Sequence, residues 1–101
     1  MSVPGLDHYD RLCDALLEQG VTPLVTLYHW DLPSELQAEG GWLNPVTGEL
    51  FGQYANVVAS RLGDRVGSWA TFNEPWCTAF LGHAAGIHAP GRRVPGESLE
   101  V

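Results

Sequence analysis

Apolar and polar positions alternate along the chain in two patterns, one typical of helices and one typical of strands. Residues 6–19 carry apolar side chains at helical spacing with acids between them, and Gly20 follows as a helix-ending residue. Residues 49–62 show the same amphipathic pattern. Residues 21–29 and 68–73 read as strands. The order helix, strand, helix, strand predicts an α/β protein.

Proline and glycine divide the segments that connect these elements. Pro33 predicts a short helix that runs to about Ala38, and the pair Gly40-Gly41 ends it. Residues 42–48 are expected to form a loop. The second strand is expected to end at Glu74-Pro75, because proline removes the next donor and holds the residue before it extended.

The length of the chain limits what these elements form by themselves. The first strand has the uncharged core Leu24–Tyr28, a pattern typical of parallel strands that are buried on both faces. Two such strands neither pair all their edges nor cover their faces, and a (β/α)8 barrel needs about 250 residues. The chain has 101 residues. We therefore interpret its α/β fold as a fragment of a (β/α)8 TIM barrel, covering about two consecutive β/α units.

Composition excludes several classes of partner. The chain carries 5 cations, all of them Arg, against 12 acids, a formal charge of −7. This balance argues against binding to nucleic acid or to an anionic membrane surface. No apolar run approaches the ~20 residues of a membrane helix, and the first residues show no signal-peptide pattern. Two cysteines do not make a disulfide scaffold, so we expect a cytoplasmic protein.

Polar and aromatic residues gather where each expected strand ends. The first strand runs into the string YHWDLP at residues 28–33, and the second into TFNEPW at residues 71–76. Active sites of parallel barrels lie at the carboxyl ends of the strands, so both strings are expected to face one shared mouth. Strict strand alternation aims Asn73 and Glu74 to opposite sides, and both reach one pocket only where the strand ends or bulges.

The two strings, in this order and with a helix between them, resemble family 1 glycoside hydrolases, the β-glucosidase family. The stretches GLDHYDRLCDALLEQGVTPLVTLYHWDLP, ASRLGDRV and GHAAGIHAPG are also similar to that family. The resemblance covers residues 4–93, whereas the tail 94–101 does not match, and a truncated or frameshifted reading frame would explain that tail. The domain expected for residues 1–101 is a partial glycoside hydrolase barrel.

The resemblance implies roles for four residues. Glu74 matches the general acid/base of the family, His29 and Trp30 match residues that line the sugar subsite, and Asn73 matches the residue that contacts the 2-hydroxyl. Aromatic and imidazole rings suit this task independently, because a sugar offers apolar C–H faces and hydroxyl edges. The alternatives are structural: an acid at a strand end, a core histidine, a packing tryptophan and a turn-forming asparagine.

A retaining glycosidase needs two carboxyl groups, and this sequence provides only the first. The nucleophile of the family lies in a Thr/Ser-Glu-Asn-Gly-type segment, which does not occur here. The function implied is hydrolysis of the O-glycosidic bond of small β-glucosides, without a cofactor, by the complete enzyme; the chain alone is expected to be inactive. The resemblance also implies a preference for plain sugars, because the similar enzymes that act on sugar 6-phosphates tend to carry a different aromatic residue at the position of Trp30. The alternatives are another retaining barrel glycosidase, such as a β-galactosidase, and a non-catalytic truncated gene product.

Several other polar residues are expected to be structural. The spacing of Cys77, His83 and His88 fits no usual zinc pattern, so no metal site is expected, and the two histidines are expected to shape a loop. Cys13 lies on the apolar face of the first helix and is expected to pack as a small hydrophobe. Three aspartates are expected to form a solvated helix face: Asp7, Asp10 and Asp14.

Overall fold

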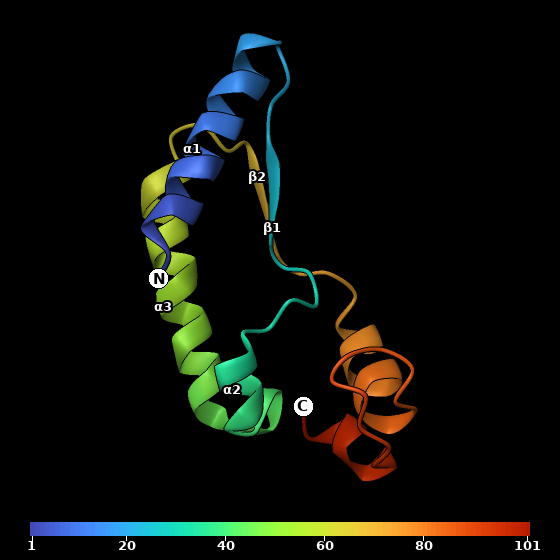
Figure 1. Cartoon of the computed structure of the whole chain (residues 1–101). Helices are drawn as coiled ribbons and strands as arrows, with labels where there is room; N and C mark the ends of the chain where they lie inside the picture. The colour runs from blue at the N-terminus through green and yellow to red at the C-terminus, as the bar shows by residue number, and fades with distance from the viewer. The chain divides into compact units, whose positions relative to one another are not determined.

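The computed structural model describes residues 1–101 and confirms the alternation of helices and strands (Figure 1). The α-helices are α1 (Val3–Glu18), α2 (Ser34–Ala38) and α3 (Pro45–Leu62), and the strands are β1 (Leu24–Tyr28) and β2 (Ser68–Phe72). The shorter helical segments are the 3₁₀ segments η1 (Gly41–Leu43) and η3 (Pro95–Leu99) and the π-helix η2 (Cys77–Ala84). None of the helices combines the length and the apolar character that crossing a bilayer requires.

The chain divides into two compact units. The first contains residues 1–27 and 50–71, and the second contains residues 28–49 and 72–101. The first unit therefore contains α1, most of α3 and most of the two strands. The second unit contains the segments that follow each strand, which are the ones that carry the candidate chemistry.

β1 and β2 are parallel neighbours, as expected, and α3 lies on the connection between them (Figure 1). The amide of Gly67 donates to the carbonyl of Pro23 at 3.0 Å, and five residues further along β1 the amide of Asn73 donates to the carbonyl of Tyr28 at 2.9 Å. The expected burial of the first strand on both faces is wrong for this two-stranded sheet. Leu24 is 67% exposed, because no further strand covers it.

α1 begins three residues before the expected start, at Val3. The hydroxyl of Ser2 accepts a hydrogen bond from the Gly5 amide at 3.2 Å, so Ser2 is the N-cap. Pro4 is compatible with this first turn, where an amide would have no helical partner. The helix ends as predicted: Gly20 has φ +73°, the left-handed conformation that glycine adopts without a Cβ penalty.

α3 begins at Pro45 rather than at residue 49, and η1 occupies part of the expected loop 42–48. The side-chain oxygen of Asn44 accepts from the amide of Val46 at 3.1 Å, and proline follows the cap at the first helical position. The pair Asn44-Pro45 is thus a start signal that the apolar periodicity does not contain.

The core of the first unit lies between α1, α3 and β1. Its buried members are Cys13, Val58, Leu62 and Val66, against which Leu6, Val25, Leu27 and Tyr54 pack. Cys13 is 3% exposed, which confirms its expected packing role. The hydroxyl of Tyr54 donates to the carbonyl of Leu27 at 3.0 Å and so ties α3 to the strand.

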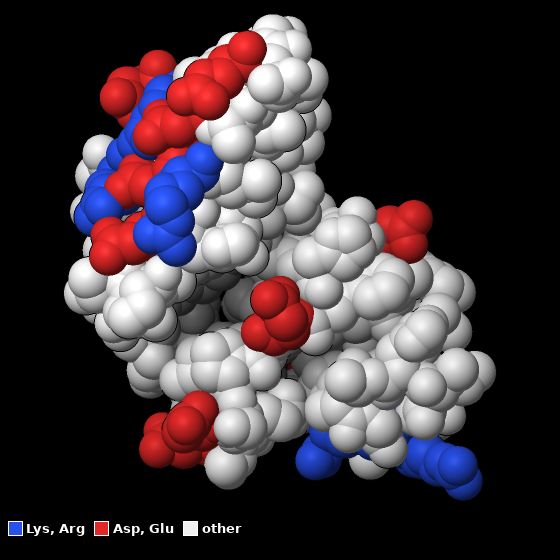
Figure 2. All heavy atoms as spheres, turned by 45° about the horizontal axis from the view of Figure 1, so that its top comes forward, with Lys and Arg blue, Asp and Glu red and all other residues white.

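Two arginines of the first unit bind the aspartates of α1. The expected solvated face holds for Asp7 and Asp14, whose side chains are 44% and 58% exposed, and is wrong for Asp10, whose side chain is 17% exposed. Arg61 bridges Asp7 and Asp10, and Arg65 lies 2.6 Å from Asp10 and 3.0 Å from Asp14. Figure 2 shows acidic and basic side chains interleaved over these helices. The hydrogen bond from Arg61, and then that from Arg65, lowers the pKa of Asp10.

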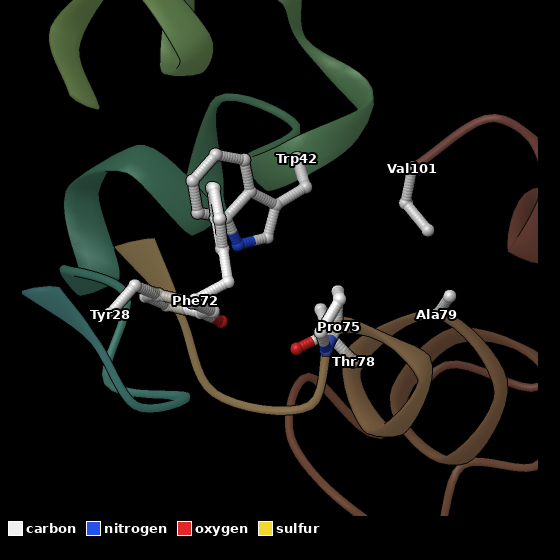
Figure 3. Close-up of a pocket in the computed structure, with 7 residues that line it drawn as sticks. All are labelled: Tyr28, Trp42, Phe72, Pro75, Thr78, Ala79 and Val101. Carbon is white, nitrogen blue, oxygen red and sulfur yellow. The ribbon is translucent and has the colours of Figure 1, made fainter. Parts of the chain in front are cut away.

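The second unit contains a cluster of three aromatic rings behind the strand ends. The ring of Tyr28 lies 5.0 Å from that of Trp42 and 5.6 Å from that of Phe72, in edge-to-face arrangements. Figure 3 shows these rings at one side of an apolar cavity of about 190 Å³, with Thr78 and Val101 also on its wall.

We expect the isolated 101-residue chain to unfold over a broad temperature range. Few apolar side chains are buried, while Leu24, Ile87 and Leu99 are 67%, 72% and 86% exposed. So small a core provides little cooperativity. Far-UV circular dichroism of the monomer during heating measures this, and a sharp two-state melt would contradict the interpretation as a barrel fragment.

Candidate functional site

The two strand ends are held together by direct hydrogen bonds in the second unit. The Trp30 indole donates from Nε1 to the carbonyl of Asn73 at 2.8 Å, and the Asn73 amide donates to the carbonyl of Tyr28. His29 lies against the tryptophan, with 5.3 Å between the ring centroids. Three of the four site residues predicted from the sequence, His29, Trp30 and Asn73, therefore lie at one place.

The backbone is left-handed at two non-glycine residues, and both are predicted site residues. Trp30 has φ +75° and Glu74 has φ +41°. The expectation that proline holds Glu74 extended is therefore wrong. Such conformations cost on the order of 1–3 kcal/mol each and concentrate at functional sites. The left-handed turn at Glu74 takes the chain out of strand alternation directly after Asn73.

The Glu74 side chain is exposed and has one neighbouring side-chain donor. The thiol of Cys77 donates to Oε2 of Glu74 across 3.3 Å. Burial, followed by the hydrogen bond to Glu74, raises the pKa of this thiol. The amide of Cys77 also donates to the Glu74 carbonyl at 2.8 Å, so the chain turns into a helix at once after Pro75.

The segment after Glu74-Pro75 is more helical than expected, and η2 carries a completely buried histidine. His83 is 0% exposed, and its Nδ1 lies 3.1 Å from Oε2 of Glu97. Arg92 donates from Nε to the same oxygen at 2.5 Å. Hydrogen bonds from Arg92 first, and from His83, lower the pKa of Glu97 to about 2. His83 thus lies inside a helix, where it helps to hold Glu97, and the expectation that it shapes a loop is wrong.

Residues 85–94, here called the strap, return along η2 and are bound to it by backbone hydrogen bonds. The amide of Arg92 donates to Gly82, and the amide of Val94 donates to His83, both at 3.0 Å. A Cβ at position 82 would lie 2.4 Å from the carbonyl oxygen of Ala89, so this close approach requires glycine. Glu97 closes the strap by binding Arg92.

The strap brings His88 to the candidate site. Its ring lies 5.5 Å from that of Trp30, with 30° between the ring planes. The indole thus has two imidazole rings close to it, those of His29 and His88. His88 lies outside the two strings at the strand ends and was not among the predicted site residues. Its sequence signal, the glycines and proline around it, indicates a shaped segment but does not reveal which ring it contacts.

A small cavity of about 70 Å³ borders Trp30, with Tyr28, Trp42 and Pro90 in its wall. Flat rings next to exposed polar groups can bind a ligand that has apolar faces and hydroxyl edges. No group of three or more His, Cys, Asp or Glu side chains in the chain is arranged to hold a metal ion. The site therefore consists of the exposed carboxylate of Glu74, one residue after Asn73, and of rings around Trp30, whose indole a hydrogen bond to Asn73 holds in place.

The family model for glycosyl hydrolase family 1 matches residues 1–100. The chain belongs to this family, which the strings at the two strand ends predicted. The match includes most of the tail that follows residue 93.

The relatives of the chain are much longer than the chain itself. It is 54% identical over 89 residues to β-glucosidase A from Thermotoga maritima, a stretch that covers 88% of this chain and 20% of the relative. It is 51% identical over 92 residues to a lactase/phlorizin hydrolase from Rattus norvegicus, covering 91% of the chain and 5% of that protein. The chain thus spans about a fifth of the curated β-glucosidase relative.

Solved structures of the family show the same local fold. A Thermotoga maritima β-glucosidase in complex with deoxynojirimycin superposes with a TM-score of 0.93 at 49% identity, covering 96% of this chain and 22% of that one. A psychrophilic β-glucosidase from Micrococcus antarcticus superposes with a TM-score of 0.92 at 55% identity. These family 1 enzymes are TIM barrels, so the chain matches part of a TIM barrel.

We expect the strap to loosen when Glu97 is protonated. The folded state lowers the pKa of Glu97 to about 2, from an unfolded value of about 4.3. Its stabilisation is therefore complete above the unfolded pKa and is lost as the pH falls from about 4.3 towards 2. A hybrid enzyme, in which this chain replaces the matching segment of the Thermotoga maritima β-glucosidase, provides the folded context. Hydrogen exchange at the amides of Arg92 and Val94 measures the effect.

The variant Glu97→Gln should remove this protection at every pH and with it the acid dependence between about pH 4.3 and 2. The exposed neighbour Glu100 provides the matched control Glu100→Gln, which should behave like the parent hybrid. Unchanged protection in Glu97→Gln would show that the ion pair does not hold the strap.

Proposed function

We propose that this chain is the acid/base portion of a retaining β-glucosidase, built from two consecutive β/α units of the barrel. The observation that carries the proposal is the left-handed Glu74, which directly follows a residue bound to the Trp30 indole. Membership of glycosyl hydrolase family 1 and the β-glucosidase relatives support it. The parent activity belongs to the complete barrel, of which the chain is about a fifth of the length.

In the proposed mechanism Glu74 transfers protons in both steps. Its protonated carboxyl gives a proton to the glycosidic oxygen while a carboxylate from the remainder of the barrel attacks the anomeric carbon and the C–O bond breaks. The ionised Glu74 then takes a proton from water, which attacks the anomeric carbon and releases the nucleophile. Retaining enzymes hold the two carboxyl groups about 5–5.5 Å apart.

The neighbours of Glu74 are proposed to bind the sugar. The indole of Trp30 offers a flat face to the C–H groups of the ring, and its N–H is already committed to Asn73, which restrains the direction of the indole. The amide of His29 donates to Oδ1 of Asp31 at 3.3 Å, which restrains the segment that carries the imidazole. The side chains of His29 and Asn73 are proposed to bind sugar hydroxyls.

The proposed substrates are small β-glucosides, and no cofactor takes part because side chains and water perform both steps. The β-glucosidase relatives favour glucose in the sugar subsite. The lactase/phlorizin hydrolase relative favours hydrolysis of β-galactosides as the second candidate activity. The ratio of kcat/KM for aryl β-glucosides to that for aryl β-galactosides, compared between the hybrid and the unmodified Thermotoga maritima enzyme, shows which of the two this chain favours.

We expect Glu74→Gln in the hybrid enzyme to reduce hydrolysis by about 10²–10⁴-fold for a poor leaving group. The defect in forming the glycosyl-enzyme should shrink as the pKa of the leaving phenol falls, because a good leaving group needs little protonation. Pre-steady-state release of a series of phenols from aryl β-glucosides measures this dependence. Glu49→Gln, an exposed acid of α3, is the matched control and should retain parental rates.

A defect of equal size for every leaving group would contradict the acid role of Glu74 and would indicate a structural one. If Glu74→Gln keeps the parental activity, Glu74 takes no part in the reaction.

The 101-residue chain alone is expected to show no glycosidase activity, because it contains no nucleophile segment. Prolonged incubation with an aryl β-glucoside, beside the Glu74→Gln chain prepared in the same way, measures any turnover. Release of phenol above that control would contradict the assignment of the nucleophile to another part of the barrel.

A further inference from the structure

We propose that Cys77 is a positioning residue for the carboxylate of Glu74, to which its thiol donates a hydrogen bond. The inference rests on the proposed role of Glu74. The bond joins Sγ to Oε2 across 3.3 Å and spans a single turn. Cys77 comes directly after the motif TFNEPW, so the motif itself assigns it no role in the reaction.

Local backbone geometry holds the two groups together. Glu74 turns out of the strand at φ +41°, and the amide of Cys77 donates to its carbonyl at 2.8 Å. Cys77 is 9% exposed, so its side chain has little freedom to turn away, whereas Glu74 is an exposed residue. One oxygen of Glu74 is therefore held from the protein side, and the other is left for substrate and water.

The chemistry of the thiol suits a group that must alternate between acid and base. Burial and the Glu74 charge raise the pKa of Cys77, so it keeps its proton at neutral pH and acts as a donor. A thiol is a weak donor, so it orients the carboxylate without fixing it in the ionised form. The other titratable groups on the neighbouring segments are His29 and Asp31 after β1, His83 on η2, and His88, Arg92 and Arg93 on the strap.

The first test compares Cys77→Ala and Cys77→Ser in the hybrid enzyme. The basic limb of the pH profile of kcat/KM reports loss of the general acid's proton. Removing a donor to the ionised form should move this limb up by about half a pH unit in Cys77→Ala. kcat/KM on a poor leaving group should fall by about 3- to 10-fold. The serine hydroxyl, a better donor, should restore the rate and return the limb to its parental position or below.

The second test measures the contact without using activity. Linkage requires that the Glu74 charge, which disfavours the thiolate, slows alkylation of Cys77. Labelling by iodoacetamide, followed at the Cys77 peptide by mass spectrometry, should therefore be about 3- to 10-fold faster in Glu74→Gln than in the parent hybrid. Cys13, buried in the core of the first unit, is the internal control and should label at the same rate in both.

The outcomes separate this proposal from the function on which it rests. The proposal is supported if the basic limb of Cys77→Ala lies at a higher pH than that of the parent, the limb of Cys77→Ser lies at or below the parental pH, and the serine variant recovers the parental rate. A parental limb in Cys77→Ala, failure of serine to rescue the rate, or unchanged labelling in Glu74→Gln would overturn it. Full hydrolytic activity in Glu74→Gln would instead overturn the proposed function, while the labelling result would still report on the contact.

Discussion

The hydrogen bond from the Trp30 indole to the Asn73 carbonyl is the contact on which the candidate site depends. It joins the residues that follow two parallel strands, and because the indole has one donor, the backbone after the other strand sets the direction of its N–H. The next residue along the chain is Glu74. The position of the carboxylate is thus tied through a single peptide unit to the surface proposed to hold the sugar.

Strain and packing act together at this place. Left-handed backbone at Trp30 and Glu74 persists only where the surroundings determine it, and here the surroundings are identifiable. The strap places His88 against the indole, and Glu97 holds the strap through Arg92 and the buried His83. A residue of the tail, which carries no recognisable motif, therefore supports a ring in the candidate site.

Much of this arrangement could be predicted from the sequence, since local patterns determine it. The strand Leu24–Tyr28 and the amphipathic helices could be predicted from the apolar pattern. The strings at the strand ends indicated the family and selected four candidate site residues: His29, Trp30, Asn73 and Glu74. Their catalytic and binding roles remain proposals. The early start of α3 is explained by the pair Asn44-Pro45, because Asn44 caps the helix and this signal is not part of the apolar pattern.

The remaining features depend on partners that are distant in sequence. The local sequence predicts a solvated Asp10, because the arginines that bind it, Arg61 and Arg65, lie more than 50 residues away in the sequence. The contact between His83 and Glu97 joins residues 14 positions apart, and the local sequence around His83 does not indicate it. The left-handed turn at Glu74 opposes the preference for extended backbone before proline, so a tertiary constraint had to overcome a local one.

A crystal structure of the hybrid enzyme with a sugar-shaped inhibitor such as deoxynojirimycin tests the central claim most directly. The result we expect is a preserved bond from the indole of Trp30 to Asn73, and a Glu74 carboxyl about 5–5.5 Å from the nucleophile carboxyl, the separation of a retaining pair. A Glu74 carboxyl turned away from the inhibitor, or held about 6.5–9.5 Å from its partner as in inverting enzymes, would contradict the account.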